Sequence, residues 1–242
     1  MNSAQLVNCC LTSKTWNVLA SNENLWNGVV LREKAFGKKQ WETYFGDIGI
    51  EPPLPTDIRN ILKSPCPFFP GKKVRESHIL VLIPETVNGK RLNLTLLGEL
   101  VKAPKDGKAT QYRYIWDEII NDQGINQATP KSHWALMTKD VIPGSRNKSY
   151  PDQKKMIADV VEKTEINYEV PNAIDALICI FMHHISSGER LFNDNPYTGT
   201  RCQESIQGYP IYVGGFSPAG LFVSIYDIDD DSIGVAALRK FL

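Results

Sequence analysis

A proline-rich stretch between residues 46 and 71, GDIGIEPPLPTDIRNILKSPCPFFPG, constrains the fold more than any other feature of the chain. Proline fixes φ and has no backbone N–H to donate, so neither a long helix nor a central strand can run through this stretch. The spacing leaves room for one short helix over 56–63, with Thr56 as its predicted N-cap. We therefore predict a stiff connection over 51–71 between two parts of the chain.

The segments on either side of this connection differ in pattern. Residues 1–50 carry apolar residues at helical spacings and predict a small helical module. Residues 72–242 mix patterns. Strands are expected at SHILVLIP and HWALMTKDVI, and helices at LTLLGELVK, YRYIWDEII, YPDQKKMIADVVEKT and VPNAIDALICIFMHHIS. Short β-prone runs separated by Gly, Pro and Asp follow residue 197. The expected fold class is α+β, with a small N-terminal helical module and a mixed domain that ends in an antiparallel sheet.

Net charge and hydropathy argue against two classes of function, nucleic-acid binding and membrane association. Lys plus Arg equals Asp plus Glu at 27 each, which offers no basis for binding nucleic acid or an anionic membrane. The longest apolar runs, HILVLIP and ALICIFM, are far shorter than the roughly 18 residues of a membrane span. The N-terminal residues lack the pattern of a signal peptide. We expect a folded cytoplasmic protein with no nucleic-acid or membrane partner.

The five cysteines have no repeated spacing, which favours free thiols in a reducing compartment over a disulfide framework. No C-x-x-C occurs, and no zinc module is predicted. His183 and His184 are adjacent on a predicted helix and point about 100° apart, so they cannot share one metal and are interpreted as helix-end residues. No metal and no cofactor are expected.

Three further motifs have ordinary structural interpretations. The acidic run YDIDDD begins like a calcium loop, but Ser232 and Leu238 stand where such a loop needs Gly and Glu, so a turn between strands is favoured. GGF at residues 214–216 lacks the phosphate-loop patterns and is interpreted as a turn joining two strands. The segment TKDVIPGSRNKSY holds Lys139, Arg146 and Lys148 and is interpreted as a solvated loop, with contact to an acidic partner as the alternative.

One enzymatic alternative concerns Cys202 in GTRCQES and His133 in KSHWAL. A nucleophilic cysteine needs a histidine in space to hold it as thiolate. A cysteine-dependent hydrolase or transferase would require the Cys202 sulfur and a His133 ring nitrogen to lie within about 4 Å in a cleft. The sequence alone does not bring the two together, and the favoured interpretation of both is structural.

The N-terminal segment LTSKTWNVLASNENLW is more specific than these motifs. Two tryptophans ten residues apart flank LAS, and a leucine precedes the second tryptophan. This segment resembles the second half of an F-box, whose pattern runs Leu-Val-Ser/Cys-Lys-x-Trp-x-x-Leu-Ala-Ser-Asp-x-x-Leu-Trp. The chain departs from it at Thr12, where Val is usual, and begins too late to contain the opening Leu-Pro-x-Glu-Leu segment. The resemblance therefore implies a partial F-box-like module over 1–50.

Other segments, among them FGKKQWETYFGDIGIEPPLPTDI, SPCPFFPGKKV, SHWALMTKDVIPGSRNKSY and GVAALRKF, resemble a family of F-box-like proteins of bacteria that live inside eukaryotic cells. The resemblance implies a non-enzymatic effector that acts in the host cytosol. Its F-box-like module would recruit a cullin-RING ubiquitin ligase through the Skp-family adaptor, and residues 72–242 would recognise an unknown protein target. The residues implied in adaptor binding are Leu6, Leu11, Trp16, Leu19, Leu25 and Trp26. An inactive truncated copy of the family is the remaining alternative.

Overall fold

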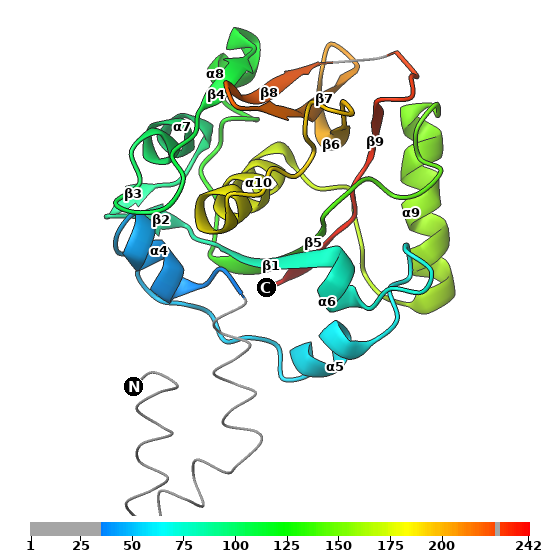
Figure 1. Ribbon diagram of the computed structural model, residues 1–242, viewed down its shortest axis with the longest axis horizontal. Helices are drawn as coiled ribbons and strands as arrows, with labels where there is room; N and C mark the ends of the chain where they lie inside the picture. Colours follow the sequence, from blue (N-terminus) through cyan, green and yellow to red (C-terminus); the bar gives the residue numbers. More distant parts are fainter. Residues whose placement is uncertain (1–34, 226–227) are drawn as a thin grey trace, which may run out of the picture.

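The computed structural model describes residues 35–225 and 228–242 (Figure 1). The six predicted adaptor-binding residues, Leu6, Leu11, Trp16, Leu19, Leu25 and Trp26, lie outside this described part. Within it, one long helix lies between two sheets, with the other helices around them (Figure 1). The α+β fold class with an antiparallel sheet is confirmed.

The central helix is α10 (Ala173–Ser187). Asn172 caps its N-terminus by accepting a hydrogen bond from the Asp175 N–H, and Gly188 ends it in the left-handed region at φ 78°. Twelve of its fifteen residues are buried, on all sides of the helix. A helix that is apolar all round must be covered on every face, and here the two sheets and helix α7 provide the cover.

The first sheet is antiparallel, with strand order β1-β5-β10. Its strands are β1 (His78–Ile83), β5 (His133–Thr138) and β10 (Leu238–Phe241). All residues of β1 and β5 are buried, so both faces of these strands are covered, although HWALMTKDVI had suggested partial alternation. The predicted strands at SHILVLIP and HWALMTKDVI are confirmed.

The second sheet has the order β4-β8-β7-β6-β9. Its strands are β4 (Tyr112–Ile115), β6 (Gly199–Ile206), β7 (Tyr209–Ser217), β8 (Gly220–Ile225) and β9 (Ile233–Val235). The three central strands pair antiparallel, and the outer strands β4 and β9 pair parallel to their neighbours. GGF lies inside β7 and beside an irregularity in its pairing with β8, so its interpretation as a turn between strands was wrong.

The remaining elements surround these layers (Figure 1). The helices are α4 (Lys38–Tyr44), α5 (Ile58–Lys63), α6 (Val74–Ser77), α7 (Leu94–Lys102), α8 (Asp117–Asn121) and α9 (Tyr150–Thr164), and β2 (Thr86–Val87) pairs with β3 (Lys90–Arg91).

Two local predictions need correction. The short helix α5 in the proline-rich stretch has Asp57, not Thr56, as its N-cap. YRYIWDEII is not one helix, because YRYI forms strand β4 and the helix begins only at Asp117. Aromatic and β-branched residues suit a pleated strand, and pairing with β8 outweighed the helical spacing.

Two apolar clusters fill the interior. The larger lies around α10 and includes Phe36, Trp41 and Phe45 from the chain before the proline-rich stretch. Trp41 is fully buried, and its Nε1 donates to the Leu82 carbonyl at 2.8 Å. The smaller cluster joins α9 and β9 to the segments before α6, after β5, before α10 and before β10: Cys66, Phe68, Phe69, Ile142, Ile157, Tyr168, Val170, Val235 and Ala237. The smaller cluster is the one that reaches the surface groove described next.

Candidate functional site

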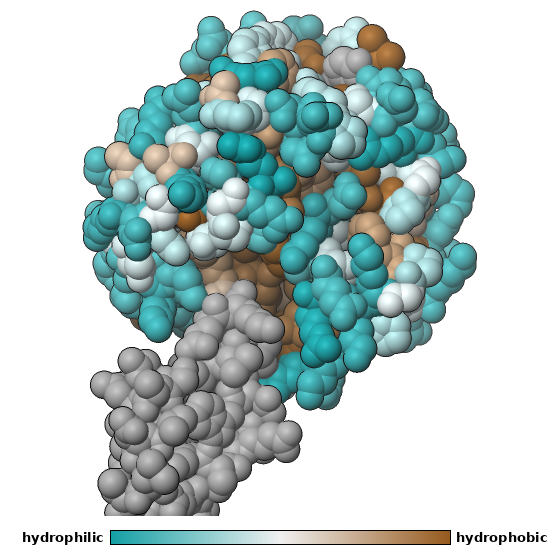
Figure 2. Space-filling view, in the orientation of Figure 1, coloured by the Kyte–Doolittle hydropathy of each residue, from teal (hydrophilic) through white to brown (hydrophobic). Residues whose placement is uncertain are grey.

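An open groove of about 750 Å³ runs along α9. Its lining residues come from α9, from the segment that precedes α10 and from β6: Tyr150, Lys154, Ile157, Ala158, Val161, Glu162, Tyr168, Glu169, Val170 and Gln203. Ile157, Tyr168 and Val170 also belong to the smaller apolar cluster. These three side chains are buried at the floor of the groove and Tyr150 and Val161 are half-buried beside them, and hydrophobic surface is visible in the region of α9 at the right of Figure 2.

Helix α9 forms one wall because its sequence is amphipathic and well capped. Ser149 accepts a hydrogen bond from the Asp152 N–H, Pro151 occupies the first turn, and Glu165 ends the helix at φ 57°. Gln153 and Ile157 are buried on the inner face. The predicted helix YPDQKKMIADVVEKT is thereby confirmed with the expected bounds.

Charged and polar groups stand at both ends of the apolar floor. At one end the Lys154 Nζ lies 4.6 Å from the centre of the Tyr150 ring, a cation–π contact. The Tyr150 hydroxyl donates to the Cys202 carbonyl, and burial, followed by the charges of Cys202 and Glu204, raises the pKa of Tyr150. Glu162, eight residues further along α9 than Lys154, contributes a carboxylate at the other end. The groove thus offers a basic end, an apolar floor and an acidic end.

Glu169 links the groove to a buried charged cluster. Lys240 Nζ on β10 lies 3.1 Å from Glu169 Oε1 and 3.1 Å from Asp175 Oδ2. The Asp175 side chain is fully buried in the first turn of α10. Burial disfavours the ammonium form, but Asp175 and Glu169 outweigh this effect and raise the pKa of Lys240. Lys240 is therefore a charged link between the central helix and the groove wall.

Two further groups surround Asp175. Glu204 on β6 accepts a hydrogen bond from the Ala173 N–H at the start of α10, and burial raises its pKa in spite of that hydrogen bond. His133 Nε2 on β5 lies 3.5 Å from Asp175 Oδ2. The α10 N-terminus favours negative charge, which helps to explain how two carboxylates are held there.

The geometry gives no support to a reaction at Cys202. The Cys202 side chain is fully buried, and burial, followed by the charges of Glu204 and Asp175, raises the thiol pKa well above its usual value. His133 directs Nδ1 at the Lys131 carbonyl, 3.1 Å away, and Nε2 has no hydrogen-bond partner in the described chain. A buried thiol that resists ionisation and lacks a hydrogen bond to the histidine is a poor nucleophile.

The other motifs singled out in the sequence have internal partners. His183 Nε2 lies 2.9 Å from Glu189, and burial lowers the pKa of His184 near the C-terminal end of α10. In the acidic run, Asp227 lies outside the described residues, and Asp229 binds the buried Arg201 at 3.1 Å. The Asp229–Arg201 ion pair therefore connects the acidic run to strand β6.

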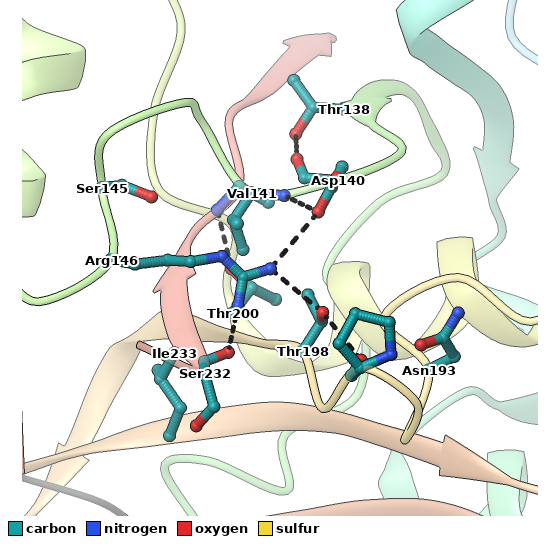
Figure 3. Close-up of polar contacts among 12 residues, drawn as sticks. Thr138, Asp140, Val141, Ser145, Arg146, Asn193, Thr198, Thr200, Ser232 and Ile233 are labelled. Carbon is teal, nitrogen blue, oxygen red and sulfur yellow. Dashed lines mark hydrogen bonds and ion pairs between the residues drawn. The ribbon is translucent and has the colours of Figure 1, made fainter. Parts of the chain in front are cut away.

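Arg146 of the basic segment is occupied within the chain (Figure 3). Its Nη1 donates to the carbonyls of Asp231 and Ser232 at 2.9 Å, and Nη2 donates to Thr198 Oγ1 at 3.0 Å (Figure 3). The guanidinium thus joins three loops that are distant in sequence, which is a structural role. The same segment also carries the other two basic residues of the motif, Lys139 and Lys148.

No family model, curated protein or solved structure matches this chain. In the described residues, no group of three or more His, Cys, Asp or Glu side chains is placed to hold a metal ion. A search of the helices in the same residues finds none with the length and apolar content needed to cross a membrane.

Sequence reasoning missed the cluster of Glu169, Asp175 and Lys240. One signal was present, because Asp175 is the single acidic residue in the apolar run AIDALICIFM. An acidic residue is also common in the first turn of any helix, so Asp175 by itself does not indicate a buried charged cluster. Glu169 and Lys240 stand 71 residues apart and have no shared pattern that would pair them.

Proposed function

We propose that this chain is a non-enzymatic protein-interaction protein of the F-box-like type. Its N-terminal segment binds the Skp-family adaptor of a cullin-RING ligase, and the α+β domain selects the protein to be ubiquitinated. As an effector of an intracellular bacterium it acts in the host cytosol. The sequence pattern around Trp16 and Trp26 supports the first part.

The observation that carries the second part is the groove along α9. A groove of about 750 Å³ with an apolar floor and charged ends can take an extended segment of another protein, with one or two apolar side chains as anchors. Its floor is built from buried residues of the smaller cluster, Ile157, Tyr168 and Val170. The ammonium of Lys154 and the carboxylate of Glu162 fix the direction of a segment that carries opposite charges at its ends.

Adaptor binding is tested with the purified full chain and a purified Skp-family adaptor, by calorimetry. The wild type should bind, the Trp16→Ala/Trp26→Ala double variant should not, and Asn17→Ala should bind like the wild type. If neither the chain nor a version with an added upstream Leu-Pro-x-Glu-Leu helix binds, the ligase function is refuted.

Target selection is tested separately through the groove. Val161→Glu places a charge on the groove lining, whereas Lys155→Ala changes an exposed residue of α9 outside the groove and is the matched control. Proteins whose ubiquitination depends on the chain should lose it with Val161→Glu and keep it with Lys155→Ala, while adaptor binding stays unchanged in both. Unaltered ubiquitination with a folded Val161→Glu variant would remove the groove from the proposal.

A further inference from the structure

A row of four aromatic rings crosses the outer face of the second sheet, away from α10 and from the groove. The Tyr114 ring of β4 stacks on Phe222 of β8 at 4.9 Å, and Phe222 lies 5.8 Å from Tyr212 of β7. The hydroxyls of Tyr212 and Tyr197 lie 3.4 Å apart. The row therefore spans the sheet from its β4 edge to the start of β6, with Tyr114 as its exposed end and Tyr212 buried at 6% exposure.

A local irregularity in β4 places Tyr114 on this face. Tyr112 lies on the inner side, where its ring is 5.4 Å from Phe181 of α10. Residues two apart in a regular strand share a face, but the pairing of β4 with β8 shifts register between Tyr112 and Tyr114. Tyr114 consequently points outward and keeps 43% of its surface exposed.

At the other end of the row, the tyrosine rings lie close to glycines of β6 and β7. Gly199 of β6 and Gly214 of β7 are paired directly, and a Cβ on Gly199 would lie 3.2 Å from the Tyr212 ring. A Cβ on Gly215 would lie 2.4 Å from the Tyr197 ring. The two tyrosine rings therefore pack close to these glycines, where a larger residue at 215 would collide with Tyr197.

Exposed acidic residues lie close in the chain to both ends of this row. Asp117 and Glu118 begin α8, three residues after Tyr114. At the far end, the backbone of the exposed Asp194 pairs with that of Tyr197, whereas Asp229 adds no free charge because its carboxylate binds the buried Arg201. This arrangement repels a phosphate backbone and favours a cationic partner.

The chain itself shows which cation the row accepts. Arg113 Cζ lies 5.2 Å from the centre of the Phe222 ring, so one guanidinium already stacks on the row. Guanidinium is planar and weakly hydrated and stacks on aromatic faces, whereas the lysine ammonium is a strongly hydrated point charge. The exposed Tyr114 ring, followed in the chain by the exposed carboxylates of Asp117 and Glu118, suits a second guanidinium.

We propose that this face docks an arginine-bearing segment of a partner protein. The partner guanidinium stacks on the exposed Tyr114 ring and pairs with the carboxylates of Asp117 and Glu118. Because this face and the groove use different residues, each surface can fail without the other.

The test measures fluorescence anisotropy of a labelled Gly-Arg repeat peptide titrated with the full chain, beside a Gly-Lys repeat peptide of equal length. The arginine peptide should bind at least about fivefold more tightly, because stacking adds to the charge attraction. Tyr114→Ala should weaken its binding about tenfold, and Asp117→Asn/Glu118→Gln should also weaken it. Tyr114→Phe should retain binding and so separate loss of the ring from loss of the fold.

The matched control is Tyr209→Ala, which removes a tyrosine of equal exposure at the start of β7, outside the row. It should bind like the wild type, as should the groove variant Val161→Glu. Equal binding of the two peptides, or a Tyr114→Ala variant that binds normally, would overturn the proposal. Tighter binding of a single-stranded RNA oligonucleotide than of the arginine peptide would also overturn it.

Discussion

His78 makes the stability of this protein acid-sensitive in a way that can be calculated. The side chain begins β1 and is only 3% exposed. Its Nδ1 lies 2.9 Å from Ser77 Oγ, and Nε2 has no hydrogen-bond partner in the described chain. Burial, with a smaller contribution from the positive charge of Lys139, lowers the pKa of His78 from 6.5 to about 4.

The sign follows from proton linkage. Between pH 6.5 and pH 4 the unfolded chain binds a proton at His78 and the folded chain does not, so acid favours unfolding. The stabilisation is complete above pH 6.5 and is lost as the pH falls toward 4. Each pH unit in this window costs about 1.4 kcal/mol, so about 2.5 kcal/mol should be lost by about pH 4.5 from this residue alone.

Urea unfolding followed by tryptophan fluorescence, at about pH 7 and about pH 4.5, measures this loss. His78→Phe keeps an aromatic ring beside Tyr168 but cannot titrate, so its loss between the two pH values should be about 2.5 kcal/mol smaller than that of the wild type. Val81→Ala is the control, because it removes buried atoms from the same strand and leaves His78 in place. Equal losses in the wild type and His78→Phe would refute the assignment of acid sensitivity to this residue.

Two further predictions concern the central helix. Lys240→Met leaves the buried Asp175 without the ammonium 3.1 Å away and should cost about 3–5 kcal/mol in urea unfolding, and adding Asp175→Asn should recover part of that loss. Gly107→Ala should destabilise the protein more than Gly144→Ala. Both glycines have positive φ, so both variants are strained in the backbone. The new Cβ at residue 107 would also lie 2.4 Å from the Ile185 carbonyl oxygen of α10, whereas no atom lies within 4 Å of a Cβ at residue 144. Gly144→Ala should cost about 1 kcal/mol from backbone strain alone, and equal thermal stability of the two variants would contradict the assigned contact.

The sequence predicted best where local chemistry and packing agree. Helices α9 and α10 were expected from their apolar spacing and from a proline near the first turn of each, and the structure adds the caps Ser149, Asn172 and Gly188. Strand YRYI was missed because its apolar spacing also suits a helix, and pairing with β8 decided the outcome. The position of GGF inside β7 depends likewise on neighbouring strands.

The sites were less predictable than the elements. Glu169, Asp175 and Lys240 come from three separate segments, and only the antiparallel bridge between Glu169 and Leu238 brings the first close to the last. The aromatic row likewise draws on β4, β7 and β8 and on the segment before β6, and a register shift within β4 turns Tyr114 outward. Neither arrangement has a spacing that periodicity can detect.

By itself the sequence determined the α+β class, a helix at VPNAIDALICIFMHHIS and strands at SHILVLIP and HWALMTKDVI. These follow from hydrophobic pattern and capping, which act over a few residues. Only the tertiary structure decided which aromatic rings lie on the outer face of the second sheet, how α9 leaves a groove open, and that Cys202 is buried. Those outcomes depend on strand pairing and on contacts between residues far apart in the chain, which local sequence does not encode.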